Sequence, residues 1–210
     1  MPKTSLNVVL LNHTPNPTKT VALAARLCMF KKSIDDLKEI ITDEYAEELV
    51  KKLIERGHIT PIEHVTFTFG IEGISRACSH QLVRHRIASY SQQSQRFVPA
   101  DDFNYIIPPK VEENPEAKKI FEEQIKNLNE AYKKLRDLGM RKEDARFLLP
   151  NACETKIICT FNISSLKHFF DLRLDKHAQW EIRAMAKKMF DLVYPICPVF
   201  FEDTKAKFFS

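Results

Sequence analysis

Glycine is scarce in this sequence of 210 residues. Only Gly57, Gly70, Gly73 and Gly139 occur. Neither the G-x-G-x-x-G turn of dinucleotide-binding folds nor the G-x-x-x-x-G-K-S/T phosphate loop can be built from them. If the chain binds a dinucleotide, side chains must hold its pyrophosphate in place of the backbone amides of a glycine-rich turn.

Cysteine and histidine also lack the spacings of metal or disulfide sites. The five cysteines are an odd number, widely spaced and without a C-x-x-C pair, which argues against a disulfide framework and a zinc site. The segment H-x-T-P-x-E-H, beginning at His58, does not have the spacing of a helical metal motif, and Pro61 prevents a helix there. We therefore expect no metal site.

Long apolar runs are absent, as is a charged-then-apolar leader at the start of the sequence. Apolar residues make up 44% and charged residues 29%, which is typical of soluble globular proteins. The net charge of +4 does not require a nucleic-acid partner but permits small anionic ligands. We expect a cytoplasmic protein without membrane or nucleic-acid partners, folded as one domain over residues 1–210.

Strand and helix patterns mix along the chain without regular βαβ alternation. Alternating or continuous apolar residues predict strands at 5–11, 65–72 and 156–162. Helical spacing predicts helices at 42–56, 75–84, 121–138, 164–173 and 179–193, and a short one capped by Thr18. We expect an α+β fold, a single domain with a mostly antiparallel sheet flanked by helices, including one long amphipathic helix that ends at Gly139.

The most informative segment is RHRIASYSQQSQR, residues 84–96. It contains three arginines, a histidine and three glutamines, with no glycine and no acidic residue. An arginine fork matches the oxygens of phosphate or carboxylate, and serine and glutamine add neutral donors. Solvated surfaces usually mix Lys with Glu, as residues 44–56 do. The segment therefore predicts a binding site for anions.

The pattern RHR, seven residues, then S-x-R resembles the signature of flavin-dependent thymidylate synthases. Further segments are similar to that family in the same order: H-x-T-P-x-E-H, EDARFLLP, FNISS and HAQWEI. The similarity runs from about Gly57 to Cys197. It implies a methyltransferase that converts dUMP to dTMP with 5,10-methylenetetrahydrofolate as carbon donor, FAD as hydride carrier and NADPH as reductant. It also implies a homotetramer whose active sites are shared between subunits.

The resemblance further implies which residues bind each ligand. Positions matching dUMP contacts are Gln81, Arg84, Gln92, Gln93, Ser94, Gln95, Arg96, Arg146 and Arg173. Positions matching FAD contacts are His58, Thr60, Arg84, His85, Arg86, Ile87, Gln92, Asn162, Ser164 and His168. Arg173 matches the catalytic arginine, because a fixed positive charge favours the N3-deprotonated form of uracil.

The chain departs from the commoner family form at two positions. Ser91-Gln92 stands where Asn-Glu is usual, and His168 stands where Asn is frequent. Simpler structural roles compete for some residues: Ser164 or Ser165 can cap a helix, and Glu143 can pair with Arg146 along one.

Ser94 invites comparison with nucleophilic serines. A serine nucleophile needs a positioned base, whereas its sequence neighbours are Gln93 and Gln95. We expect Ser94 to be a ligand of the nucleotide, with no covalent bond between enzyme and uracil.

Two other functional classes compete with the flavoenzyme. A basic module for RNA or single-stranded DNA would be colourless and would bind oligonucleotides with steep salt dependence. A phosphatase using His85 would also be colourless and would release phosphate from monophosphates. The absorbance spectrum of the purified protein distinguishes the three classes, because only the flavoenzyme should be yellow and lose its flavin bands when NADPH is added.

Overall fold

The structure is a computed structural model that describes residues 4–209. Their contacts divide the chain into two compact units. Unit 1 holds residues 4–7, 71–84 and 91–158, and unit 2 holds residues 8–70, 85–90 and 159–209. That residues 1–210 form a single functional domain stays a prediction.

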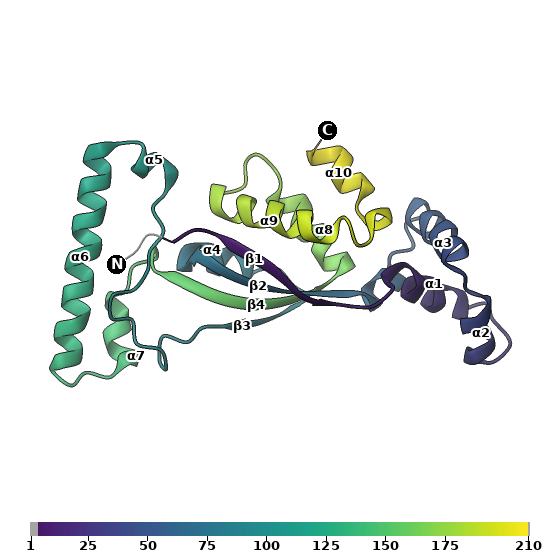
Figure 1. The fold of residues 1–210 in the computed structure, drawn as a ribbon, viewed down its shortest axis with the longest axis horizontal. Helices are drawn as coiled ribbons and strands as arrows, with labels where there is room; N and C mark the ends of the chain where they lie inside the picture. Colours follow the sequence, from purple (N-terminus) through teal and green to yellow (C-terminus); the bar gives the residue numbers. More distant parts are fainter. Residues whose placement is uncertain (1–3, 210) are drawn as a thin grey trace. The chain divides into compact units, whose positions relative to one another are not determined.

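The strands form one sheet in the order β1-β2-β4-β3 (Figure 1). Their bounds are β1 Asn7–His13, β2 Thr66–Ser75, β3 Ala88–Gln92 and β4 Glu154–Asn162. The amide of Thr14 donates to Thr66 O, and that of Ile163 donates to Val65 O, so the end of β1 and the end of β4 lie beside the start of β2. The sheet is antiparallel, and the predicted α+β class is confirmed.

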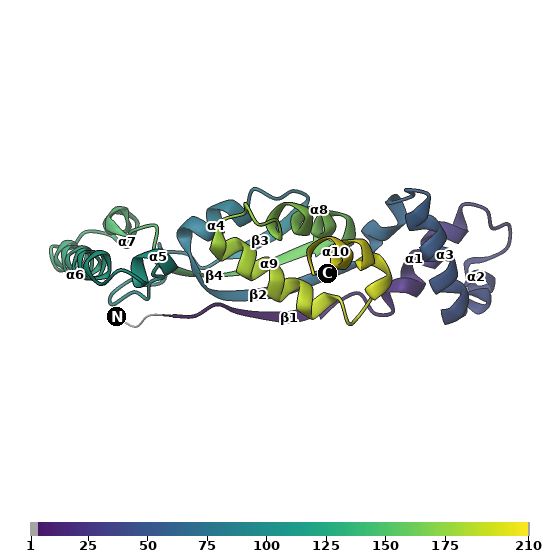
Figure 2. The same ribbon diagram turned by 90° about the horizontal axis from the view of Figure 1, so that it is seen from above.

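In unit 2, one face of the strands is covered by helices (Figures 1 and 2). These are α8 Ile163–Arg173, α9 Trp180–Val193 and α10 Glu202–Phe208, with the short helix η3 Pro198–Phe200 between the last two. Because strand side chains alternate between faces, Phe67 and Phe69 of β2 share a face and are fully buried, as is Phe161 of β4. Phe169 of α8 packs on Phe161 with ring centroids 5.6 Å apart. This aromatic core fixes α8 against the sheet.

The remaining helices of unit 2 are α1 Pro17–Leu27, α2 Ile34–Ile40, α3 Asp43–Glu55 and the 3-10 helix η1 Thr60–His64. The predicted cap at Thr18 is wrong, because α1 begins at Pro17 after Asn16, whose left-handed φ is 46°. Helix α2 was not predicted from the apolar pattern, since it is short and only Leu37 of its residues is fully buried. Its capping box, with Ser33 and Asp36, was the available signal.

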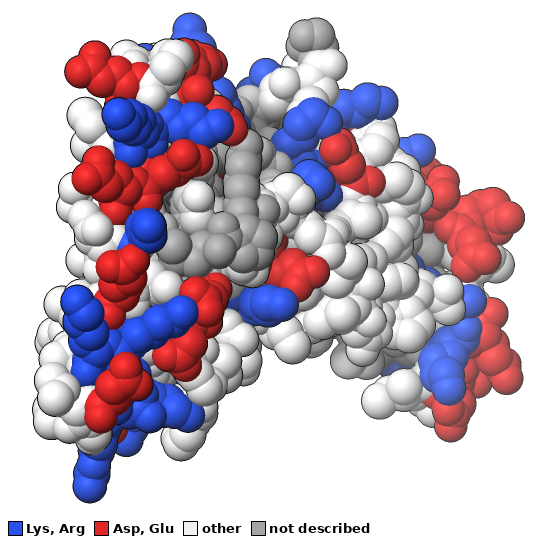
Figure 3. Space-filling model, turned by 60° about the vertical axis from the view of Figure 1, so that its left-hand side comes forward, with Lys and Arg blue, Asp and Glu red and all other residues white. Residues whose placement is uncertain are grey.

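Unit 1 contains α4 Arg76–Leu82, α5 Pro109–Glu112, α6 Pro115–Asp137, α7 Lys142–Ala145 and the 3-10 helix η2 Arg146–Leu148. The long amphipathic helix is confirmed as α6, which starts earlier than predicted because the Asn114 side chain caps it and Pro115 suits its first turn. Its residue Ile125 packs with Phe103 and Tyr105 of the proline-rich connection. The solvent face of α6 mixes basic and acidic side chains (Figure 3).

Strand β3 was not predicted, because its sequence ASYSQ is only five residues long and has only Ala88 and Tyr90 as apolar residues, although its burial alternates. It lies at the edge of the sheet, where polar side chains are tolerated. The helix stops expected at Gly57 and Gly139 are confirmed by their φ values of 71° and 82°. Within residues 4–209, no helix has both the length and the apolar character to cross a membrane.

Candidate active site

The histidine of the RHR segment is buried in unit 2 and contacts the last residue of α8. Only 6% of the His85 surface is exposed. The Nε of Arg173 donates a hydrogen bond of 2.8 Å to His85 Nε2. The Phe169 ring packs edge-on against the imidazole at 4.9 Å between centroids. The Tyr90 hydroxyl donates to the backbone oxygen of His85 at 2.8 Å, which fixes the backbone of the segment.

The surroundings of His85 favour its neutral form. Burial, then the charge of Arg173 and then that of His168, lower the pKa of His85 to about 4. Because Nε2 accepts the hydrogen bond from Arg173, the single ring proton lies on Nδ1. At neutral pH the contact therefore joins a charged donor to an uncharged acceptor.

Acid should weaken the fold through His85. Its folded pKa of about 4 lies below its ordinary value of 6.5, so the unfolded chain binds the proton first as the pH falls. The stabilising contribution is thus complete above pH 6.5 and is lost progressively toward pH 4. Urea unfolding should show this decline in the wild type and a shallower one in His85→Gln. Identical pH profiles for the two proteins would contradict it.

Most of the other residues matched to flavin positions also lie in unit 2, whereas Arg84 and Gln92 belong to unit 1. Ile87 is 77% exposed, and Arg86 beside it is exposed. His168 is exposed on α8, with its ring 6.4 Å from that of His85. The sequence assigned the cap of this helix to Ser164 or Ser165, which is wrong. The Asn162 side chain caps α8 instead, accepting from the Ser165 amide at 2.8 Å.

His58 and Thr60 lie where the chain enters β2. The His58 amide donates to Leu53 O at 2.9 Å, directly after the turn at Gly57. Thr60 begins η1, which packs against both α1 and α8. Both residues are exposed. The structure therefore brings the H-x-T-P-x-E-H segment next to α8, and the binding roles of its residues stay predictions.

Arg76 and Arg146 of unit 1 interact electrostatically. Burial lowers the pKa of Arg76, and the positive charge of Arg146 lowers it further, while Cys153 opposes this shift. Both side chains are half-buried. Two like charges in such surroundings repel each other, and a bound anion relieves the repulsion.

The sequence reading included Arg146 but missed Arg76. A signal was available, because Arg76 is the first residue of α4. A cation in the first turn of a helix opposes the helix dipole, so an arginine there calls for another explanation.

Glu143 binds a different arginine from the one expected. Its carboxylate accepts from Arg96 Nε at 3.0 Å and lies 3.6 Å from Arg141. The expected side-chain pair with Arg146 is wrong, since Arg146 Nε donates instead to the backbone oxygen of Glu143 at 3.2 Å. An anion that binds Arg96 must therefore compete with this carboxylate.

Gln92 has partners within the protein. Its Nε2 donates to Ser79 Oγ at 2.9 Å and to Thr155 Oγ1 at 3.0 Å, so it links β3 to α4 and β4. Both hydroxyl-bearing residues are buried. The amide nitrogen thus has a structural role, and ligand binding by Gln92 stays a prediction.

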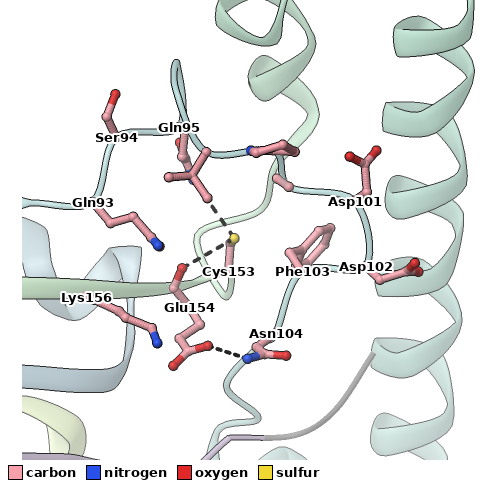
Figure 4. A pocket seen from close by; sticks show the side chains of 13 residues that line it. Gln93, Ser94, Gln95, Asp101, Asp102, Phe103, Asn104, Cys153, Glu154 and Lys156 are labelled. Carbon is pink, nitrogen blue, oxygen red and sulfur yellow. Dashed lines mark hydrogen bonds between the residues drawn. The ribbon is translucent and has the colours of Figure 1, made fainter.

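Ser94 lies in the turn after β3, at the rim of a pocket of about 220 Å³, with its side chain pointing away from Cys153 (Figure 4). Its Oγ accepts from the Arg96 amide at 3.2 Å, which leaves the hydroxyl proton free to donate. Gln93 and Gln95 also line this pocket. The sequence grouped these side chains with Arg96, and the structure brings them together in one turn.

Two reactive side chains on the opposite wall of this pocket have structural roles. The Glu154 carboxylate accepts from Asn104 Nδ2 at 2.6 Å and from the Gly73 amide at 3.0 Å. Burial raises the pKa of the Cys153 thiol to about 11, so it is protonated at neutral pH. The pocket therefore offers binding groups, and neither Glu154 nor Cys153 is placed for nucleophilic chemistry.

Gln81 and Arg84 lie at the end of α4. The helix ends at Leu82 instead of Arg84, and the Arg84 amide donates to Gln81 O at 3.3 Å in the turn that follows. Gln81 is half-buried and Arg84 is exposed. Gln81 therefore lies one helical turn before Arg84, and the binding roles of both residues stay predictions.

Known proteins resemble this chain over nearly its whole length. The family model described as thymidylate synthase complementing protein (Thy1) matches residues 9–199. A flavin-dependent thymidylate synthase of Geobacter sulfurreducens is 50% identical over 200 residues, covering 94% of this chain and 86% of that protein. One of Clostridium tetani is 44% identical over 213 residues, with coverages of 94% and 86%.

A solved structure shares the fold. The crystal structure of a UMP/dUMP methylase PolB from Streptomyces cacaoi, bound with 5-Br dUMP, matches with a TM-score of 0.85 at 22% identity. The match covers 98% of this chain and 97% of that one. The family match and these relatives show that the chain belongs to the flavin-dependent thymidylate synthase family.

Proposed function

We propose that the protein methylates dUMP to dTMP, with 5,10-methylenetetrahydrofolate as carbon donor, FAD as cofactor and NADPH as reductant. The names of its relatives and the dUMP methylase with the same fold support this reaction. The main structural observation that supports it is the hydrogen bond between Arg173 and the neutral imidazole of His85. This half-buried arginine is bonded to a neutral histidine, so its charge remains available to a substrate.

The residues of unit 1 fit the nucleotide. Ser94, Arg96 and Arg146 supply a hydroxyl and two guanidinium groups for a monophosphate, and we add Arg76 because the charge of Arg146 lowers its pKa. Charge-assisted bonds of this kind hold phosphate strongly without a glycine-rich loop. The remaining proposed contacts to dUMP are Gln81, Arg84, Gln92, Gln93 and Gln95.

The residues of unit 2 fit a flavin dinucleotide. Arg86 is an exposed cation suited to a pyrophosphate, and the exposed Ile87 offers apolar surface to a ring system. When bound, FAD would supply hydride chemistry that no side chain can provide. We propose as its ligands His58, Thr60, His85, Arg86, Ile87, Asn162, Ser164 and His168 of unit 2, and we add Arg84 and Gln92, which belong to unit 1.

Arg173 is the proposed catalytic residue. A guanidinium in contact with the uracil ring stabilises the N3-deprotonated anion and lowers the pKa of that nitrogen. No covalent enzyme bond is needed. A serine nucleophile requires a free base, and the Nε2 lone pair of His85 is already occupied by Arg173. A Ser94-linked nucleotide trapped during turnover would contradict this mechanism.

We propose a cytoplasmic homotetramer whose active sites are shared between subunits. In unit 2, β1 leaves Val9 and Leu11 42% and 52% exposed. Adjacent exposed apolar side chains are typical of a surface that packs against another protein. Light scattering coupled to gel filtration tests the assembly, and a fully active monomer would contradict it.

Absorbance spectroscopy tests the function directly. The purified protein should be yellow, NADPH should bleach its flavin bands, and dTMP should form when dUMP and methylenetetrahydrofolate are added. A colourless protein with salt-sensitive oligonucleotide binding would indicate a nucleic-acid module. Release of phosphate from dUMP would indicate a phosphatase.

Arg146→Ala should weaken dUMP binding by about 10- to 100-fold, because a hydrogen bond to a charged group contributes about 1.5–3 kcal/mol. Binding of deoxyuridine, which lacks the phosphate, should not change. Calorimetric titration of both ligands measures the difference. Arg56→Ala, at the exposed end of α3, is the matched control. Equal losses for nucleotide and nucleoside would exclude a phosphate role for Arg146.

A further inference from the structure

The side chain of Arg173 is fixed by a hydrogen bond that does not neutralise its positive charge. Its Nε donates to His85 Nε2 at 2.8 Å, and an imidazole nitrogen that accepts a hydrogen bond carries no proton. Arg96, by contrast, is paired with the carboxylate of Glu143 at 3.0 Å. Among the ion pairs found within residues 4–209, none joins Arg173 to a carboxylate.

The acceptor itself is rigidly held. The His85 ring is buried, and Phe169 packs edge-on against it at an interplanar angle of 83°. The Tyr90 hydroxyl binds the backbone oxygen of His85. Arg173 is equally anchored, since it is the last residue of α8. Both ends of the contact are therefore fixed by the packed interior of unit 2.

We propose that His85 is a positioning residue that aims the guanidinium of Arg173 at the uracil while leaving its positive charge uncompensated. The proposal rests on the function proposed above. A guanidinium has five N–H donors, and the bond from Nε leaves those of both terminal nitrogens for a substrate. A carboxylate could orient the side chain equally well, but its charge would cancel the field that stabilises the uracil anion.

The charged groups around His85 favour the neutral imidazole that this hydrogen bond requires. Among the described residues, the charged or titratable side chains that act on the ring are Arg173 and His168, both on α8. Each opposes protonation of the imidazole. An imidazolium has no acceptor for Arg173 Nε, so strong acid should release the guanidinium and lower the turnover number.

Three substitutions of His85 in the flavin-loaded enzyme separate orientation from charge. His85→Gln keeps a neutral acceptor, His85→Leu removes it, and His85→Glu supplies a charged one. We expect kcat to fall about 10- to 100-fold in His85→Leu, the range produced by misplacing a catalytic group. His85→Glu should lose at least as much, and the loss in His85→Gln should be smaller than in either of the other variants. The KM for dUMP should change less than kcat.

A spectroscopic measurement avoids dependence on turnover. The fluorine-19 shift of bound 5-fluoro-dUMP, followed against pH, reports ionisation at N3. The pKa of N3 should rise in His85→Leu and His85→Glu and stay near the wild-type value in His85→Gln. His80→Leu, on the exposed face of α4, is the control and should match the wild type. If His85→Leu does not fold, the comparison of the similarly sized Gln and Glu variants decides alone.

A double-mutant cycle with Arg173→Lys tests whether His85 acts through the arginine. The effect of His85→Leu on kcat should shrink severalfold when Arg173→Lys is already present. The proposal is overturned if His85→Leu lowers kcat by the same factor in the wild-type and Arg173→Lys backgrounds. It is also overturned if the flavin-bound fraction of the His85→Leu enzyme has the wild-type kcat. A wild-type enzyme that binds no 5-fluoro-dUMP and makes no dTMP would instead refute the proposed function itself.

Discussion

Arg173→Ala should lower kcat for dUMP methylation by about 100- to 1000-fold, the loss typical when a preorganised group that stabilises transition-state charge is removed. The physical reason is the loss of a fixed positive charge that lies at the end of α8 and is bonded to neutral His85. Flavin content should remain that of the wild type. Steady-state kinetics and the flavin-to-protein absorbance ratio measure the two effects separately.

Two variants make this result specific. Arg173→Lys keeps the charge but lacks the planar fork, so its activity should lie between the wild type and the alanine variant. Arg183→Ala removes an arginine of α9 that donates to Lys176 O, and it should leave kcat unchanged. If Arg173→Ala retained near-normal kcat, another group would have to stabilise the uracil anion.

The parts of the fold that the sequence predicted correctly have strong apolar periodicity. Residues 65–72 alternate Val, Phe, Phe and Ile with Thr, Gly and Glu, and this pattern gives β2 its buried face. The long helix α6 shows the same regularity at helical spacing. Strand β3 was not predicted because it is a five-residue strand at the sheet edge, with Ala88 and Tyr90 as its only apolar residues.

The sequence indicated which residues are candidates for the site, but it did not indicate which of them contact one another. The scarcity of glycine and the RHR segment indicated side-chain anion binding. No local pattern connects His85 with Arg173, which are 88 positions apart, because such a contact is set by how α8 packs on the sheet. Glu143 was assigned to Arg146 by helical spacing, yet a 3-10 helix begins at Arg146, and the carboxylate reaches Arg96 instead.

These contacts show two ways of keeping an arginine ready for an anion. Arg96 is neutralised by Glu143, and its side chain is 55% exposed; the proposed phosphate would have to compete with this carboxylate. Exposed ion pairs are weak, about 0–1 kcal/mol, so a phosphate can displace the carboxylate. Arg173 is half-buried, where a carboxylate would be hard to displace, and its partner is a neutral imidazole.

Phe170→Ala should have the largest effect on stability, about 3–5 kcal/mol of unfolding free energy. Phe170 is completely buried in α8. Its ring lies 5.8 Å from Phe169, 5.5 Å from Phe190 and 5.8 Å from Phe201, measured between centroids. Truncation therefore leaves a cavity between α8, α9 and the segment before α10. Equilibrium urea unfolding at pH 7 measures the loss.

Phe170→Ala and Arg173→Ala should differ in their effects, because Phe170 is expected to contribute to stability and Arg173 to the proposed activity. Phe170→Leu keeps most of the volume and should cost less than about 1.5 kcal/mol. Phe147→Ala, at a side chain 85% exposed, should change stability by less than about 0.5 kcal/mol. Arg173 lies one turn beyond Phe170 on α8, so the Phe170→Ala enzyme that remains folded should lose less activity than Arg173→Ala. A loss below about 1 kcal/mol for Phe170→Ala would mean that the aromatic cluster does not hold α8 in place.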